Sequence, residues 1–152
     1  MSIIEMIPDQ LYASGRIRQK DWAYIDRHID AIINLRLIPD QPPFSHHPIL
    51  LIWAPLMMWP APSLQWLVQL MNQMNTLIDS GYRVLAHCHL GMHRLGFVLT
   101  AYYMQRFKLT CSEALAAVRT KKRNVDPPVY FLELLREYEK YLGIQSHKKK
   151  ND

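Results

Sequence analysis

Residues 83–107 constrain the fold of this chain more than any other stretch. Their sequence, RVLAHCHLGMHRLGFVLTAYYMQRF, begins with a short apolar run that ends at His87 and Cys88. A turn that contains Gly91 follows, and an almost uninterrupted apolar segment begins after Arg94. Because a short apolar run before a glycine-containing turn is typical of a buried strand, the pattern predicts a strand, a turn and a long buried helix.

The predicted turn brings a thiol, free backbone amides and a guanidinium into one small volume. Amides at the start of a helix lack partners within the helix and lie at the positive end of its dipole. They can bind a phosphate and stabilise a thiolate at the same place. The pattern therefore predicts Cys88 as a nucleophile and Arg94 as a clamp for two phosphate oxygens. The residues predicted to bind phosphate are His89, Leu90, Gly91, Met92, His93 and Arg94.

The segment HCHLGMHR resembles the signature of the cysteine-based protein tyrosine phosphatases, in which His-Cys is followed by five residues and Arg. By this resemblance His87 supports the loop, and Gly91 stands at its usual place. LYASG at residues 11–15 and AIINLR at residues 31–36 are similar to the opening segments of small dual-specificity phosphatases. The resemblance covers most of the chain. It implies phosphomonoester hydrolysis through a cysteinyl-phosphate intermediate, without a cofactor.

Two residues depart from the pattern of that family. Leu95 stands where the family has a Ser or Thr that helps the thiolate leave the phosphoenzyme. The general acid of the family, an Asp, is replaced by Leu56, or at most by Met57 or Met58, and none of these side chains can donate a proton. Because general acid catalysis contributes about a hundred- to ten-thousandfold, we expect reduced activity or a non-standard acid.

The sequence leaves the identity of a replacement acid open. Asp126 lies in the loop before the last predicted helix, and the corresponding loop of similar phosphatases borders the site. His89 and His93 lie within the signature, and His46 and His47 lie in a proline-rich loop. Histidine titrates in a suitable range for this work. Asp126 is therefore one candidate catalytic acid beside four histidines.

Two other functions remain open at this point. The chain could be a pseudophosphatase that binds phosphorylated partners without turnover, because an anion cradle needs no acid. A metal site is the second alternative, since His87, Cys88, His89 and His93 are all ligand types. Zinc sites usually show paired spacings, whereas Gly91 interrupts this group and neighbouring strand residues point to opposite faces. We therefore expect no metal and no cofactor.

The predicted elements define an α/β fold. We expect strands at residues 10–14, 31–35, 49–54 and 84–86, and helices at 20–29, from Ser63 to Gly81, after Gly91, at 112–120 and from Pro128 to Gly143. Strands that alternate with helices predict a single, mostly parallel sheet flanked by helices on both faces, like that of the dual-specificity phosphatases. In such sheets ligands bind beyond the carboxyl ends of the strands, where Cys88 falls. Trp53 is expected in the core.

Length and charge set the remaining expectations. A chain of 152 residues suits one catalytic domain at residues 1–143, followed by a basic, disordered tail at 144–152. The net charge of +5 derives partly from that tail, so it suits a phosphorylated substrate, such as a phosphotyrosine protein or an aryl phosphate, and does not indicate nucleic-acid binding. The two cysteines favour the cytoplasm, and the lack of a long apolar stretch favours a protein that binds no membrane. The sequence does not indicate the oligomeric state, and a monomer is the default expectation.

Overall fold

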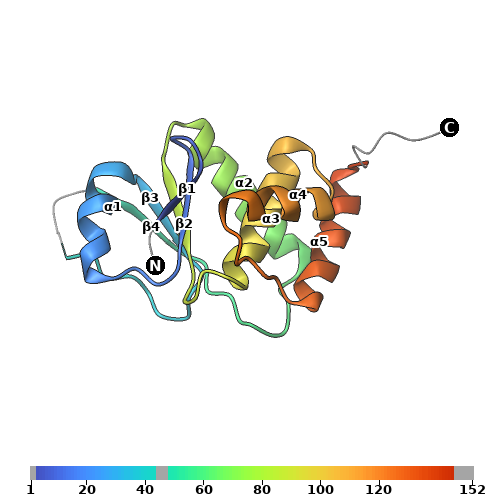
Figure 1. The fold of residues 1–152 in the computed structure, drawn as a ribbon, viewed down its shortest axis with the longest axis horizontal. Helices are drawn as coiled ribbons and strands as arrows, with labels where there is room; N and C mark the ends of the chain where they lie inside the picture. Colours follow the sequence, from blue (N-terminus) through green and yellow to red (C-terminus); the bar gives the residue numbers. More distant parts are fainter. Residues whose placement is uncertain (1–2, 44–47, 146–152) are drawn as a thin grey trace.

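The computed structural model describes residues 3–43 and 48–145 of the chain. Within these ranges a five-stranded sheet lies between helix α1 on one face and helices α2 to α5 on the other (Figure 1). The strands are β1 (Ile4–Ile7), β2 (Leu11–Ser14), β3 (Ala31–Asn34), β4 (Leu50–Trp53) and β5 (Val84–His87). The helices are α1 (Trp22–His28), preceded by the 3-10 turn Gln19–Asp21, α2 (Leu64–Asp79), α3 (Arg94–Phe107), α4 (Cys111–Lys121) and α5 (Val129–Leu142).

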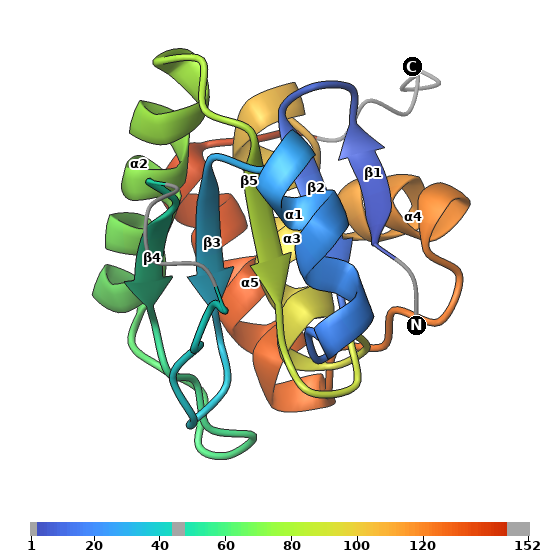
Figure 2. The same cartoon turned by 90° about the vertical axis from the view of Figure 1, so that its left-hand side faces the viewer.

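The sheet has the strand order β1-β2-β5-β3-β4 (Figure 2). Strands β2, β5, β3 and β4 run parallel to one another, and β1 pairs antiparallel with β2. Strand β5 is therefore the central strand, with a parallel neighbour on each side. These observations confirm the expected α/β fold with a single, mostly parallel sheet flanked by helices on both faces.

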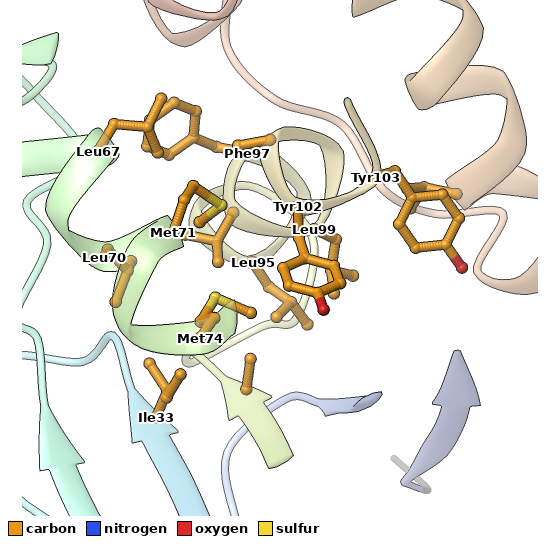
Figure 3. Packing of buried hydrophobic residues seen from close by; sticks show 14 of the residues in the cluster. Ile33, Leu67, Leu70, Met71, Met74, Leu95, Phe97, Leu99, Tyr102 and Tyr103 are labelled. Carbon is orange, nitrogen blue, oxygen red and sulfur yellow. The ribbon is translucent and has the colours of Figure 1, made fainter. Parts of the chain in front are cut away.

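Each face of the sheet has its own apolar core. On the α1 face, Trp22 and Ile25 of the helix pack with Ile32 of β3 and Leu85 of β5. On the other face, α2 and α3 meet over the sheet, and Figure 3 shows Met71 and Met74 of α2 facing the side chains of α3. Residues 95–104 of α3 are all buried, which explains why its sequence is almost uninterruptedly apolar.

The helix ends follow local signals in the sequence. Ser63 caps α2, because its hydroxyl accepts a hydrogen bond from the backbone N–H of Trp66 at 3.0 Å. Thr110 and Glu113 form a reciprocal capping box at the start of α4, as the sequence predicts. Helix α5 ends at Gly143, which has a φ of +68° and so adopts the left-handed conformation that glycine tolerates best.

Two sequence-based predictions about the sheet were incomplete or wrong. The predicted first strand at residues 10–14 is the second, since β1 precedes it; β1 is only four residues long and its pairing with β2 is irregular between Glu5 and Ile7. Trp53 is not in the core, because 51% of its surface is exposed on the edge strand β4. Its indole N–H donates a hydrogen bond to the carbonyl of Arg36 at 2.8 Å, so the indole nitrogen has a hydrogen-bond partner.

No helix in the described ranges combines the length and the apolar character that crossing a membrane requires. Residues 146–152, which make up most of the predicted tail, lie outside the described part of the chain. His46 and His47, two of the candidate acids, also lie outside it.

Candidate active site

The strand register brings four loops to one edge of the sheet. Ser14 of β2 and Asn34 of β3 both lie opposite His87 of β5, and Asn34 also lies opposite Trp53 of β4. Because these parallel strands end at the same level, the segments that follow them emerge side by side. This edge is the carboxyl edge, where ligands bind in sheets of this kind.

The segment after β5, residues 88–93, is here called the Cys88 loop. It contains no helix or strand, and Gly91 turns it with a φ of +73°, a conformation that side-chain-bearing residues rarely adopt. The turn directs the N–H of Gly91 at the sulfur of Cys88, 3.2 Å away. Such a donor stabilises the thiolate more than the thiol. Helix α3 begins directly after the loop, at Arg94.

Three neighbouring segments hold the end of β5 and the Cys88 loop in place. Each does so with a backbone hydrogen bond of 2.9 Å, in which the N–H comes from the neighbour and the carbonyl from the loop or its strand. The pairs are Leu35 with His87, Arg16 with His89, and Asp126 with Met92. The loop is therefore fixed by the segments after β2 and β3 and by the loop between α4 and α5. This fixation suits a rigid anion site.

Arg94 reaches from the start of α3 to the segment after β4. Its guanidinium donates to the carbonyl of Leu56 at 3.1 Å. The side chain of Leu56 is 2% exposed and packs in the core, so it cannot serve as an acid. The backbone of this position thus orients the predicted phosphate clamp, although its side chain lacks the proton donor that the family resemblance implies.

Cys88 and Arg94 line one cavity of about 230 Å³. The other lining residues are Met58, His89, Leu90 and His93. None of the lining residues carries a carboxylate, so a general acid from this wall would have to be a histidine. The exposed side chains of Met58 and Leu90 give the mouth an apolar character, which suits an aromatic phosphoester.

The carboxylate of Asp126 is not among the groups that line this cavity. It is 68% exposed, and its Oδ1 lies 3.7 Å from a guanidinium nitrogen of Arg119. The backbone carbonyl of Asp126 lies instead 2.8 Å from the Nδ1 atom of His93. In this structure the residue therefore supports the Cys88 loop through its backbone, and the structure does not bring its side chain to the thiol.

Leu95 lies away from the cavity, in the core. Its side chain is fully buried and packs in the cluster formed by α2 and α3, as Figure 3 shows. No hydroxyl is available at the position that follows Arg94. Leu95, which departs from the family pattern at this position, therefore packs in the core.

Sequence reasoning missed Asp40, which is the partner of His87. The Oδ2 atom of Asp40 lies 3.0 Å from Nε2 of His87, and the two side chains are 7% and 0% exposed. Nδ1 of His87 is also buried and has no hydrogen-bond partner among the described residues. Asp40 lies in a proline-rich loop 47 residues before His87, and no local pattern links the two.

Lys122 is a buried lysine at the start of the loop between α4 and α5. It lies at the end of α4, is 3% exposed, and donates to the side-chain oxygen of Asn124 at 2.9 Å. Burial lowers the pKa of its ammonium group, and electrostatic attraction to Cys88 acts in the opposite direction.

The residues considered as metal ligands do not form a cluster. Within residues 3–43 and 48–145, no three His, Cys, Asp or Glu side chains come together as a metal ion would require. Cys88 and Cys111 are both free thiols.

A thiol at the carboxyl end of a central parallel strand, with a following turn and an arginine at the start of a helix, defines a protein of the cysteine-dependent phosphatase class. The model of the dual specificity phosphatase catalytic domain matches residues 11–141 of this chain. The chain therefore belongs to the dual specificity phosphatase family.

Individual relatives agree with this assignment. Human dual specificity protein phosphatase 6 is 38% identical over 63 residues, and tyrosine-protein phosphatase YVH1 of Saccharomyces cerevisiae is 42% identical over 60 residues. These segments cover 41% and 40% of this chain but only 16% of each relative. Among solved structures, Tk-PTP in the active form has a TM-score of 0.79 and 25% identity, and the match covers 91% of this chain and 97% of that one.

Proposed function

We propose that this chain hydrolyses phosphomonoesters, with phosphorylated proteins as its substrates and Cys88 as its nucleophile. The observation that carries the proposal is the hydrogen bond of 3.2 Å from the Gly91 N–H to the sulfur of Cys88, in a loop whose cavity Arg94 also lines. Residues 1–143 form the catalytic unit in this proposal.

The reaction takes place in two steps. In the first, the Cys88 thiolate attacks phosphorus, an S–P bond forms, and the ester P–O bond breaks so that the leaving oxygen departs with its electron pair. The backbone amides of residues 89–94 and the guanidinium of Arg94 stabilise the charge on the equatorial oxygens. In the second step water attacks phosphorus and the S–P bond breaks with its electron pair on sulfur. One proton of the water stays on the phosphate, and the other returns to the group that protonated the leaving oxygen, so the products are inorganic phosphate and the thiolate.

The first step proceeds without a dedicated carboxylic acid. No carboxylate lines the Cys88 cavity, so the leaving oxygen takes its proton from water or from His89 or His93, which do line it. A phenol, with a pKa of about 10, leaves more readily than an alkyl alcohol. Substrates with a phenolic leaving group, including phosphotyrosine, are therefore the preferred ones.

The test compares para-nitrophenyl phosphate, a phosphotyrosine peptide and the same peptide with phosphoserine. The expected result is measurable turnover of the two aryl esters, a rate on phosphoserine lower by about a hundredfold or more, and loss of all turnover in Cys88→Ser. Equal rates on the tyrosine and serine peptides would show that an efficient acid operates. Undiminished activity of Cys88→Ser would exclude the proposed nucleophile.

A second candidate function is phosphate binding without turnover. It is favoured by the same wall of the cavity, which offers no carboxylate, and by Leu95, which packs in the core where the family has a hydroxyl. Wild-type protein that binds the phosphotyrosine peptide but releases no phosphate from any of the three substrates would support this function over hydrolysis.

A further inference from the structure

The second step of the proposed reaction needs a proton acceptor. Water that attacks the cysteinyl phosphate loses a proton, and a positioned base accelerates such a step by about a hundred- to ten-thousandfold. Leu56 and Leu95 stand where the family has an acid and a hydroxyl, and both are buried in the core without a polar side-chain atom. The acceptor is therefore to be sought among the side chains that line the Cys88 cavity.

Two of the six described residues that line this cavity carry an imidazole, which takes up a proton near neutral pH. They are His89 and His93. During the second step Cys88 carries the phosphate, and the guanidinium of Arg94 stays charged and has no lone pair to offer. The choice of a base thus lies between the two histidines.

The ring of His93 is held by a backbone carbonyl. Its Nδ1 atom lies 2.8 Å from the carbonyl oxygen of Asp126. A carbonyl oxygen can only accept, so Nδ1 carries the hydrogen of this bond. In the neutral ring the lone pair then lies on Nε2, and no hydrogen bond from the described residues engages that atom. His93 is therefore held in the tautomer that a base needs.

The carbonyl that holds the ring is itself fixed. The N–H of Asp126 donates to the carbonyl of Met92 at 2.9 Å, so the backbone of one residue binds two consecutive residues of the Cys88 loop. The preceding residue, Val125, is 1% exposed, and its carbonyl accepts from Nε of Arg119 at 2.9 Å. A base whose ring is oriented by a fixed third group is the arrangement that activates a reacting atom in enzyme sites.

His89 is held less well than His93. It is exposed, and no hydrogen bond from the described residues engages its ring. Its backbone is fixed instead, because its carbonyl accepts from the N–H of Arg16 at 2.9 Å. A catalytic base has to reach the proton in a defined orientation, so the geometry favours His93.

We propose that His93 is the general base of the second step, and that its Nε2 atom takes a proton from the water that attacks the cysteinyl phosphate. The inference rests on the proposed function, because it requires a phosphorylated Cys88. As the water oxygen bonds to phosphorus, one of its protons moves to Nε2 and the other stays on the phosphate, while the S–P bond breaks with its electron pair on sulfur. The imidazolium then gives its proton to solvent, which balances the proton that the leaving oxygen takes from water in the first step.

This role concerns the second step alone. It leaves the first step without a dedicated acid, so the expected preference for phenolic leaving groups is retained. It also supplies help to the step that lacks the family's hydroxyl, since Leu95 packs in the core.

The experiment separates the two steps with para-nitrophenyl phosphate in rapid-mixing kinetics. Release of nitrophenol reports the first step and release of phosphate the second, for wild type and His93→Gln. Glutamine keeps an N–H that can donate to the carbonyl of Asp126, but it takes up no proton. We expect the variant to release about one nitrophenol per enzyme in a burst and then to turn over about a hundredfold more slowly than wild type. Because kcat/KM reports the first step, kcat and KM should fall together while kcat/KM is retained, which also shows that the variant is folded.

Chemical rescue distinguishes a base from a residue that only supports the loop. Imidazole added to His93→Ala should restore the release of phosphate, because it supplies the missing base from solution. It should not accelerate the wild-type protein.

The pH profile of the second step is a further readout. In wild type its rate should rise with pH through the range in which histidine titrates and then level off, and His93→Gln should lack this rise. The other charged or titratable groups near the ring are His89 and Arg94 in the cavity wall, and Asp126 with Arg119 behind it. All of them are present in the variant, so the comparison isolates His93.

Two variants serve as controls. His28→Gln should keep wild-type kinetics, because His28 lies on α1, where its ring contacts Tyr24, and does not line the Cys88 cavity. His89→Gln should keep the rise of the second step with pH, whatever its effect on substrate binding.

Three results would overturn the inference. They are a His93→Gln protein with no burst and an undiminished kcat, a His93→Ala protein that imidazole does not rescue, and a rise with pH that is lost in His89→Gln instead. In each case wild-type turnover would leave the proposed hydrolysis intact. A wild-type protein that releases neither nitrophenol nor phosphate would refute the proposed hydrolysis, and this inference with it.

Discussion

At the scale of single residues, the site depends on side chains that do not touch the proposed substrate. His87, which directly precedes Cys88, forms a buried pair with Asp40 at a separation of 3.0 Å. A buried polar group that loses its hydrogen-bond partner pays the full cost of its desolvation, which exceeds what the bond contributes. Asp40 therefore fixes the end of β5, and through it the sulfur of Cys88.

Substitution Asp40→Asn is expected to lower the free energy of unfolding by about 1–3 kcal/mol, because it replaces the carboxylate that is hydrogen-bonded to His87 with a weaker partner. We also expect kcat to fall, with a smaller effect on KM, since the anion cradle is retained while the sulfur is less well placed. Urea unfolding and steady-state kinetics on para-nitrophenyl phosphate measure the two effects.

The control for this substitution is Glu137→Gln, which removes an exposed carboxylate from α5 and should change stability by no more than about 0.5 kcal/mol. If Asp40→Asn had the same small effect as Glu137→Gln, the pair would not support the site.

At the scale of elements, helix α3 and the loop between α4 and α5 meet at Gly96. A Cβ atom at this position would lie 2.6 Å from Cγ1 of Val125, which is itself buried. The next residue, Asp126, donates to the Cys88 loop through its backbone. The glycine thus lets a distant loop approach closely enough to hold the Cys88 loop.

Gly96→Ala is expected to destabilise the protein, although alanine favours helices. The gain in helix propensity is at most about 1 kcal/mol, whereas overpacking costs about 1–3 kcal/mol. Displacement of Val125 should also weaken binding of vanadate or phosphate. Urea unfolding and competition with substrate report the two changes.

Gly143→Ala provides the matched control for Gly96→Ala. It is strained by its φ of +68° but has open space around it, so it should destabilise without changing anion affinity. Unchanged anion affinity in Gly96→Ala would show that the loop contact does not shape the site.

Strand β1 contributes a pH-dependent contact to the sheet. The hydroxyl of Tyr12 in β2 donates to Oε2 of Glu5 in β1 at 3.1 Å. Burial is the larger cause and this hydrogen bond the second cause of a raised pKa of Tyr12, which rises from 10.0 to about 12. Since the raised pKa favours the neutral phenol in the folded state, its contribution is fully present below pH 10 and is lost as the pH rises toward about 12.

The prediction is that wild-type protein loses more unfolding free energy than Tyr12→Phe between pH 10 and about pH 12. Comparison of the two proteins isolates this residue, because other buried tyrosines titrate in both. An equal loss of unfolding free energy in the two proteins would mean that the contact with Glu5 is not retained in solution.

At the scale of the whole molecule, local patterns in the sequence predicted the architecture. Contacts between segments far apart in the sequence could not be predicted in this way. The apolar run before Cys88, the turn at Gly91 and the capping signals at Ser63 and Thr110 are local, and the elements they predict are present. Strand β1 escaped prediction because its four residues are paired irregularly and only one of them is fully buried. A short, half-exposed strand carries no clear period.

The candidate site shows the same division. Cys88, Gly91 and Arg94 lie within seven residues, so sequence alone could place them together. The pairs Asp40 with His87, Leu56 with Arg94 and Gly15 with His89 connect separate loops. Those loops meet because the parallel strands end in register, and register is decided by packing of the whole sheet.

The central claim is that the Cys88 loop is a positively polarised hollow that holds an ionised sulfur. Cys111 is an internal control, because Cys88 and Cys111 are similarly buried, at 2% and 5% exposed, and burial raises the pKa of the Cys111 thiol. The measurement is the rate of alkylation of each cysteine by iodoacetate near neutral pH, followed by peptide mass spectrometry, with and without vanadate. We predict that Cys88 is alkylated much faster than Cys111 and that vanadate slows only Cys88. If Cys88 reacts no faster than Cys111 and vanadate does not protect it, the account is contradicted.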